Sequence, residues 1–199
     1  MVFPDQRKKK SNNTDILDEQ IVYVSFSCVS WACLKIRLFY ILSSLQKRNM
    51  SFNIVLIEPE IPTNTGNIGR LSLATGSKLH LVKPFGFELS DKRVKRAGLD
   101  YWQHLDLKIY ESVAQFFEVH HDKSFAFFSS HGSRDYWDIA YQDDMFLVFG
   151  KESVGLSPSI TKAHPTKLCK IPLHSQHIRS INLANAVGIA VYEGLRQLR

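Results

Sequence analysis

The sequence has few cysteines, and none of them is placed to bind a metal. Cys28, Cys33 and Cys169 are the only three among 199 residues, and they form neither a C-x-x-C pair nor a Cys/His ligand pattern. This argues against a disulfide framework and against a zinc site, so we expect no metal cofactor. Unpaired thiols in odd number are typical of the reducing cytoplasm, where we expect the protein.

The common nucleotide-binding loops are absent as well. Neither G-x-x-x-x-G-K-[ST] nor G-x-G-x-x-G occurs, which argues against a P-loop and against a dinucleotide-binding fingerprint. The sequence also has no internal repeat and no low-complexity tract. Its length and its 44% of hydrophobic residues are those of an ordinary globular chain with one real core.

No apolar run is long enough to span a membrane without interruption by charge. Residues 21–42 come nearest, but Lys35 and Arg37 interrupt them, which is costly deep in a bilayer. A signal peptide is a second interpretation, because the basic run Arg7–Lys10 precedes this stretch; acidic residues intervene, however, and no small-residue cleavage site follows. We expect residues 1–49 to be a disordered or dispensable extension, with a membrane role and a packed accessory element as open alternatives.

Positive charge is modest and unevenly placed. The formal net charge is +6, and residues 1–49 carry +4 of it, with eight Lys and Arg against four Asp and Glu. A basic balance permits a nucleic-acid partner without proving one. Any such site in the main body must therefore be a local patch. The densest basic run there is made of Lys92, Arg93, Lys95 and Arg96.

From residue 50 onward, short apolar runs alternate with helical patterns, which predicts a parallel sheet covered by helices on both faces. The expected strands are Asn53–Ile57, Leu79–Val82, Leu107–Tyr110, Ser124–Ser129, Met145–Phe149 and Lys167–Ile171. The expected helices are Asn67–Thr75, Asp91–Ala97, Ser112–Val119, Ser159–Ala163 and Leu183–Leu198.

Three loops that follow expected strands are rich in Gly, Pro and Asn, and such loops bind ligands in open α/β sheets. The first runs from Glu58 to Arg70. We expect Gly66 to adopt a conformation closed to other residues and Asn67 to cap the next helix. Arg70 would then lie one turn inside that helix, beside free backbone N–H groups that attract an anion. An exposed arginine after a capped turn is the alternative interpretation.

The second loop, Phe149–Pro158, places two glycines around a carboxylate. Gly150 would let a ligand approach the backbone, and Glu152 would either fix the loop or bind a ligand hydroxyl. A glycine turn before a helix start is the simpler alternative. The third loop, Ile171–Ala186, has more polar residues at its helix entrance than the one that a cap requires, which indicates a site. They are Arg179, Ser180, Asn182 and Asn185.

Together the three loops resemble the SPOUT superfamily of RNA methyltransferases, most closely its small TrmL-type members, which methylate a wobble ribose of tRNA. The shared patterns are P-x-N-x-G-N-x-x-R from Pro62, F-G-x-E-x-x-G-L from Phe149, I-P-[ML] from Ile171 and R-S-[ILM]-N-L-x-N-A from Arg179. Residues 92–102 are also similar, and the resemblance covers residues 51–199.

Two departures from the family pattern leave every motif residue in place. The stretch between Leu173 and Arg179 is one residue longer than usual, and Ala184 stands where the family often has Ser. The longer stretch could shift the cofactor contacts of loop 174–178. The family has no counterpart of residues 1–49.

The resemblance implies an α/β fold with a mostly parallel sheet, helices on both faces and a C-terminal trefoil knot over residues 50–199. It implies S-adenosylmethionine as methyl donor, and as acceptor the 2′-hydroxyl of the wobble nucleotide (position 34, cytidine or modified uridine) in the anticodon loop of tRNA, with leucine tRNAs as expected substrates. It also implies a homodimer, with no other stable protein partner.

Site residues follow from the family motifs. The catalytic group would be Arg70, Ser180, Asn182 and Tyr192. The cofactor would contact Phe128, Gly150, Glu152, Ile171, Leu173 and Ser180. RNA would contact Asn64, Lys92, Arg93, Lys95, Arg96 and Arg179. Because arginine stays protonated in proteins, we expect Arg70 to clamp a phosphate and stabilise the developing alkoxide rather than act as a base. Replacing Gly150 by Val should block the cofactor while the fold survives.

Further expectations concern other residues of the main body. Tyr101 and Trp102 either stack on an exposed base or pack in the core, and Tyr192 has core packing as an equal alternative. Four histidines without ligand geometry are expected on the surface, namely His120, His121, His174 and His177. A homodimer would use apolar positions of the first and last helices, namely Leu71, Leu73, Ala74, Ile189, Val191 and Leu195.

Three alternative functions stay open at this point. The chain could methylate another tRNA position or ribosomal RNA, although the lack of a separate RNA-binding domain favours the wobble nucleotide. It could be an RNA-binding protein that has kept the fold without the activity, against which the presence of Arg70, Glu152 and Asn182 argues. A membrane-tethered protein would rest on residues 21–42 alone.

Overall fold

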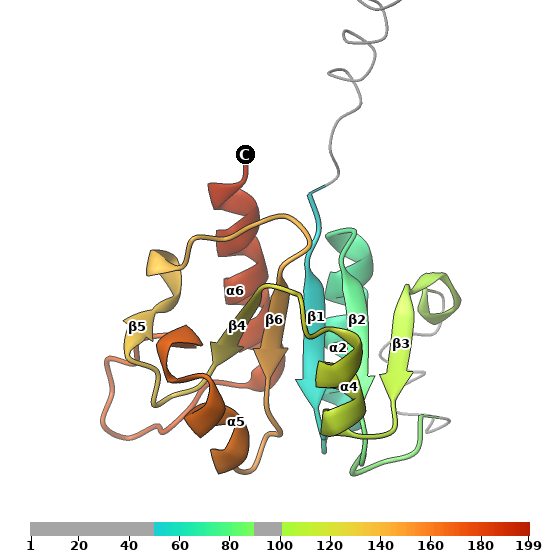
Figure 1. Cartoon of the computed structure of the whole chain (residues 1–199), viewed down its shortest axis with the longest axis horizontal. Coiled ribbons are helices and arrows are strands. Elements are labelled where there is room, and N and C mark those ends of the chain that lie inside the picture. Colours follow the sequence, from blue (N-terminus) through green and yellow to red (C-terminus); the bar gives the residue numbers. More distant parts are fainter. Residues whose placement is uncertain (1–49, 90–100) are drawn as a thin grey trace, which may run out of the picture. The chain divides into compact units, whose positions relative to one another are not determined.

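A computed structural model describes residues 50–89 and 101–199 (Figure 1). The extension 1–49, the helix expected over Asp91–Ala97 and the basic run Lys92, Arg93, Lys95 and Arg96 therefore lie outside the described residues. Among the described helices, none combines the length and the apolar character that crossing a membrane requires.

The described residues form a seven-stranded sheet in which every pair of neighbouring strands is parallel. The strands are β1 (Asn53–Ile57), β2 (Lys78–Val82), β3 (Leu107–Tyr110), β4 (Phe125–Phe128), β5 (Arg134–Asp135), β6 (Phe146–Phe149) and β7 (Leu168–Lys170). The six expected strands are confirmed to within one residue at each end. β5 was missed, because two residues carry no periodic pattern.

Strand order places a topological switch point in the middle of the sheet. The order is β3-β2-β1-β6-β4-β7-β5, so the chain leaves β1 toward one edge and later returns to add β6 on its other side. Open α/β sheets bind ligands in the crevice outside the carboxyl ends of the strands at such a point. The fold therefore directs attention to the loops that follow β1 and β6.

Two helices cover each face of the sheet (Figure 1). They are α2 (Pro62–Ala74), α4 (Val113–Val119), α5 (Pro158–Ala163) and α6 (Leu183–Gln197), with short 3-10 turns at Trp102–His104, Tyr136–Asp138 and Pro165–Lys167. α2 and α6 pack against each other and share one core, whereas α4 and α5 close the other with Phe116 and Ile160. Mostly parallel strands with helices on both faces are thus confirmed.

The start of α2 differs from the expectation. The helix begins at Pro62, five residues before Asn67, so Asn67 is not its cap and Gly66 is an ordinary helical residue without a positive φ angle. Proline is well suited to the first turn, where its missing N–H costs nothing. Arg70 is consequently the ninth residue of α2, more than two turns from its start, and the predicted anion site combining Arg70 with the helix N-terminus is wrong.

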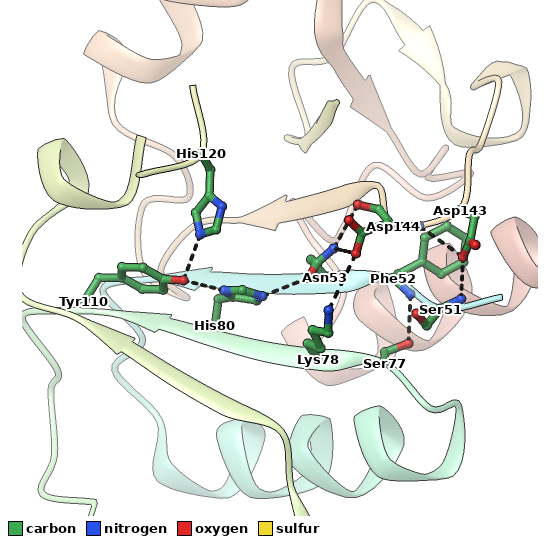
Figure 2. A network of polar contacts seen from close by, with 10 residues as sticks. All are labelled: Ser51, Phe52, Asn53, Ser77, Lys78, His80, Tyr110, His120, Asp143 and Asp144. Carbon is green, nitrogen blue, oxygen red and sulfur yellow. Dashed lines mark hydrogen bonds and ion pairs between the residues drawn. The ribbon is translucent and has the colours of Figure 1, made fainter. Parts of the chain in front are cut away.

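A buried polar network crosses the sheet on the side of α4 (Figure 2). His80 contacts the Tyr110 hydroxyl at 2.8 Å and the Asn53 side chain at 3.0 Å, and Tyr110 also contacts His120 at 2.8 Å. His80 is 1% exposed and His120 is 8% exposed. The surface position expected for His120 is therefore wrong, whereas His121, His174 and His177 are exposed as expected.

Candidate functional site

The three motif loops meet at the carboxyl ends of the strands, as the sequence predicts. The Glu152 carboxylate, after β6, accepts hydrogen bonds from the backbone N–H groups of Glu60 at 2.8 Å and Ile61 at 3.3 Å, and from the Asn64 side chain at 2.9 Å. The Asn182 amide in turn donates to the Asn64 side-chain oxygen at 3.0 Å. Asn64 thus links the loop after β6 to the loop that precedes α6.

Glu152 supplies what the start of α2 lacks. Ile61 occupies the N-cap position and has no side-chain acceptor for the free N–H groups of the first turn. A carboxylate from the loop after β6 accepts from Ile61 itself and from Glu60, and its negative charge faces the positive end of the helix dipole. Of the two roles expected for Glu152, fixing a loop is the one that the contacts support.

Asn182 and Asn64 also have their polar groups engaged within the protein. Asn182 caps α6, because its side-chain oxygen accepts from the N–H groups of Ala184 at 2.9 Å and Asn185 at 3.4 Å. Asn64 is 5% exposed, and both ends of its amide are bonded to Glu152 and Asn182. In this conformation Asn64 holds the site together, and its predicted contact with RNA would require these bonds to open.

Charged side chains surround a small cavity beside these loops. Lys151 forms an ion pair with Glu58 at 3.0 Å, and this bond raises the pKa of Lys151. The cavity has a volume of about 180 Å³. Its lining comprises Glu58, Glu60, Pro84, Phe85, Gly86 and Lys151. No group of three or more His, Cys, Asp or Glu within residues 50–89 and 101–199 is placed to hold a metal ion.

The residues predicted to contact the cofactor lie along the neighbouring ends of β4, β6 and β7. The Phe128 ring stacks on Phe149, with centroids 4.5 Å apart. Ile171 and Leu173 are half-buried just after β7, and Ser180 is exposed. Apolar side chains and an aromatic pair are thus assembled at the carboxyl ends of these strands.

Gly150 is required by its own loop, contrary to our expectation. A Cβ there would lie 2.1 Å from the Gly155 carbonyl carbon and 2.2 Å from the Leu156 nitrogen, both backbone atoms. Any larger residue would therefore push the Lys151–Gly155 turn away from β6. The prediction that Gly150→Val leaves the fold intact rested on an open space that the loop fills, so this substitution cannot isolate the cofactor site.

Arg70 is exposed on α2 above an aromatic side chain. Its guanidinium carbon lies 5.9 Å from the centroid of the Tyr101 ring, and no carboxylate among the described residues pairs with it. The Tyr101 hydroxyl donates to the Gly66 carbonyl at 2.7 Å; burial raises the pKa of Tyr101, and Arg70 opposes that rise. Trp102 packs so closely that a Cβ on Gly69 would lie 2.9 Å from its ring. These contacts favour the packing interpretation of Tyr101 and Trp102.

Tyr192 lies apart from the other predicted catalytic residues of the same chain. It is 55% exposed, so the core-packing alternative is wrong. Asn182 caps the start of α6 and Tyr192 is the tenth residue of that helix, so the two positions are separated by about 15 Å along the axis. Tyr192 and Asn182 of one chain therefore do not contact each other. Arg179 is exposed in the loop before α6.

Sequence reasoning missed the pairing of Glu60 with Ser153. The Glu60 carboxylate accepts from the Ser153 N–H at 3.0 Å and from its hydroxyl at 2.9 Å, across 93 positions of sequence. Glu60 lies inside the first motif loop and Ser153 inside the second. Their neighbours therefore marked the region, but no local pattern could have paired the two residues.

A protein-family model and two named relatives each match this chain over most of its length. The model of the SpoU rRNA Methylase family matches residues 51–192. The tRNA (cytidine(34)-2′-O)-methyltransferase of Escherichia coli (strain K12) is 43% identical over 147 residues, which cover 73% of this chain and 93% of that protein. A Listeria monocytogenes protein provisionally given the same name is 45% identical over 151 residues, covering 74% of this chain and 89% of that one.

A solved structure is similar to this chain as well. The structure described as "Structural insights into the 2-OH methylation of C/U34 on tRNA" has a TM-score of 0.72 and 41% identity, and covers 75% of this chain and 97% of that chain. The residues that are similar include all three motif loops, since the family match begins before Glu58 and ends after Asn182.

Proposed function

This chain belongs to the SpoU rRNA methylase family, and we propose that it transfers a methyl group to the 2′-hydroxyl of the wobble nucleotide of tRNA, a cytidine or a modified uridine at position 34. The names of its relatives support this substrate. The observation that carries most weight is the junction of Glu152, Asn64 and Asn182, which joins the motif loops at the switch-point crevice. A transfer reaction has to bind two substrates, and three loops that meet at one crevice offer contacts for both.

S-adenosylmethionine is the proposed donor, and when bound it supplies a methyl group on a sulfonium that is already an excellent leaving group. The residues present fit its adenosine part, because half-buried Ile171 and Leu173 offer apolar contact. We also propose a trefoil knot in the C-terminal part. This proposal rests on the family to which residues 51–192 belong.

The chain's own residues have to orient the ribose and help its hydroxyl to lose a proton. Arg70 is exposed and keeps its charge, so it clamps the phosphate next to the target ribose and stabilises the developing alkoxide. The exposed Ser180 hydroxyl hydrogen-bonds the ribose, whereas Asn182 acts through its cap on α6 and its bond to Asn64. The proton passes to solvent as the new C–O bond replaces the C–S bond.

A homodimer completes this site in our proposal. α2 and α6 pack side by side and leave three apolar side chains 38–55% exposed on the two helices, namely Leu73, Ile189 and Tyr192. Val191, which the sequence also suggested for this face, is fully buried in the core and is excluded from it. Arg70 and Tyr192 of one chain would then serve the cofactor of the other, in keeping with the separation of Tyr192 from Asn182 along α6.

Calorimetry with S-adenosylmethionine and a methyl-transfer assay with tRNA test the function together. We expect binding and transfer; binding of tRNA without either would favour an RNA-binding protein that has lost catalysis. Shared sites are tested by mixing Arg70→Ala chains with Ser180→Trp chains, whose exposed indole would fill the cofactor site. Mixed dimers, verified by native mass spectrometry, should recover one working site, and no recovery would mean that each chain builds its own.

We further propose that residues 50–199 are the working domain in a cytoplasmic enzyme. The first strand and all three motif loops lie within that range. A chain that begins at Met50 should fold and retain methyl transfer. Loss of folding, or a loss of activity above about tenfold, would assign residues 1–49 to the working domain.

A further inference from the structure

The loops after β1 and β6 exchange carboxylates with each other. Glu152 reaches from the loop after β6 to the backbone of Glu60, and Glu60 reaches back to the backbone and hydroxyl of Ser153. The backbone N–H groups of Glu60 and Ile61 thus donate to the Glu152 carboxylate, and Ser153 donates to the Glu60 carboxylate. Hydrogen bonds to an ionised acceptor are about twice as strong as neutral ones, so this exchange holds the two loops in one relative position.

The two halves of the exchange have different consequences for the fold. The Glu152 half replaces a missing helix cap on α2 and is therefore needed by the structure. The Glu60 half caps no helix. Its acceptor oxygens bind Ser153 alone among the described residues, and they fix the tight turn that is closed by the Gly155 N–H donating to the Lys151 carbonyl at 2.8 Å.

The outer part of that turn has few other contacts, whereas its first two residues are held by the Lys151–Glu58 ion pair and by the donors to Glu152. Ser153, Val154 and Gly155 are exposed, and Val154 is 72% exposed, so apolar packing does not fix its outer part. The turn nevertheless lies against Gly150, the residue that follows β6 and at which the proposed cofactor site begins. A shift of the turn would therefore be transmitted to the backbone that faces the cofactor.

We propose that Glu60 and Ser153 are positioning residues for methyl transfer, which hold the Gly150–Gly155 turn so that the cofactor is bound in its reactive place. This inference rests on the proposed function. Neither residue touches the reacting atoms. The pair acts through the turn, so its loss should weaken cofactor binding more than it weakens folding.

Three substitutions in the full chain test the pair. Glu60→Ala removes both bonds and should raise the Kd and KM for S-adenosylmethionine about tenfold, with a smaller change in kcat at saturating cofactor. Ser153→Ala removes one bond and leaves the backbone N–H in place, so a twofold to fivefold rise is expected. Glu60→Gln keeps one acceptor oxygen and should restore most of the affinity that Glu60→Ala loses.

Glu111→Ala is the matched control. It removes an ion pair with Lys83 at 2.8 Å at the carboxyl ends of β3 and β2, and this carboxylate is 73% exposed and bonds to Lys83 rather than to either motif loop. Its Kd and KM should equal those of the wild type. Thermal unfolding of each variant, measured without cofactor, separates an effect on the turn from general loss of structure.

The possible outcomes distinguish failure of this inference from failure of the proposed function on which it rests. A wild-type chain that binds no S-adenosylmethionine would overturn the proposed function and this inference with it. A wild-type chain that binds, together with unchanged Kd and KM in Glu60→Ala and Ser153→Ala, would overturn the inference alone. A fall in the unfolding temperature without any change in cofactor affinity would also overturn it, since the pair would then be purely structural. If Glu60→Ala does not fold, Ser153→Ala decides.

Discussion

The two polar networks of this protein use similar hydrogen-bonding groups in opposite environments. Beneath α4, His80, Tyr110, His120 and Asn53 are each less than a tenth exposed. At the carboxyl ends of β1 and β6, by contrast, a set of carboxylates and one lysine is only partly buried. Glu58 and Lys151, for example, keep 31% and 32% of their side chains exposed. The first network lies within a core, and the second faces the crevice proposed to bind substrates.

With both histidines neutral, the buried network has one hydrogen-bonding order along the contacts drawn in Figure 2. Asn53 donates from its amide nitrogen to the Asp144 carbonyl at 2.8 Å and carboxylate at 2.9 Å, so its oxygen faces His80. His80 must therefore donate from Nε2 and accept at Nδ1 from the Tyr110 hydroxyl. The Tyr110 oxygen is then left to accept from His120 Nε2. Both histidines are neutral in this arrangement.

The comparison of the two networks distinguishes residues that stabilise the fold from residues that serve the reaction. A fully buried network cannot take up a charge or exchange partners without cost, so it specifies the fold and one protonation state. The half-exposed network contains charges that water can also solvate, so its loops can yield to a ligand. We therefore expect substitutions in the first network to change stability and substitutions around the second to change activity.

The largest effect is expected from Arg70→Ala. Loss of the exposed guanidinium should lower kcat by about a hundredfold or more, equivalent to about 2.7 kcal/mol of transition-state stabilisation, with cofactor affinity and unfolding temperature unchanged. Steady-state methyl transfer and calorimetry measure this. Arg199→Ala, another exposed arginine, is the control. If Arg70→Ala lost stability without a loss of kcat, the assignment of Arg70 to the reaction would be contradicted.

Glu152→Ala should affect both properties, because Glu152 belongs to the site and also caps α2. Three donors lose their acceptor, and we expect a loss of about 2 kcal/mol of unfolding free energy together with at least a tenfold loss of activity. Urea unfolding and methyl transfer are the measurements, and Glu118→Ala, an exposed carboxylate on α4, is the control. Unchanged stability would show that Glu152 does not act as the cap of α2.

Acid should weaken the buried network. Burial, aided by the charges of His120, Lys108 and Lys78 and opposed by Asp144, lowers the pKa of His80 from 6.5 to about 3. Burial, with Lys108 and Lys123, also lowers the pKa of His120, which Asp122 and Asp144 oppose. The unfolded chain then binds more protons than the folded one below pH 6.5.

Stability should accordingly be complete above pH 6.5 and be lost as pH falls toward 3. His80 alone contributes up to about 1.4 kcal/mol per pH unit in that range, or roughly 2 kcal/mol between neutral pH and pH 5. Urea unfolding at a series of pH values measures the slope. A flat profile between pH 7 and pH 5 would show that the histidines are not held neutral.

Tyr110→Phe should have the smallest effect of the four. It removes the hydroxyl between the two histidines and leaves a buried acceptor on His80 and a donor on His120 unsatisfied, at a cost of about 1–2 kcal/mol. Methyl transfer per folded molecule should not change. A Tyr110→Phe protein with full stability and reduced kcat would reverse the roles that we assign to the two networks.

Sequence patterns predicted most of the sheet because its central strands are continuous apolar runs. They also predicted that three distant loops would meet, because the carboxyl ends of parallel strands all lie at the same end of the sheet. They misplaced the start of α2, whose capping carboxylate, Glu152, lies more than 80 positions away along the chain. They missed the burial of His120 for a similar reason, since its partner Tyr110 belongs to another element. Local patterns report local structure, and both errors concern groups satisfied by tertiary contacts.

The central claim is methyl transfer to the wobble ribose. The most direct test incubates the full chain and S-adenosylmethionine carrying an isotope-labelled methyl group with a leucine tRNA, and locates the label by mass spectrometry of nuclease fragments. We predict label on the ribose of nucleotide 34, appearing about a hundredfold more slowly or less when Arg70→Ala replaces the wild type. Label on a base, label at another nucleotide, or none with the wild-type chain would contradict the claim.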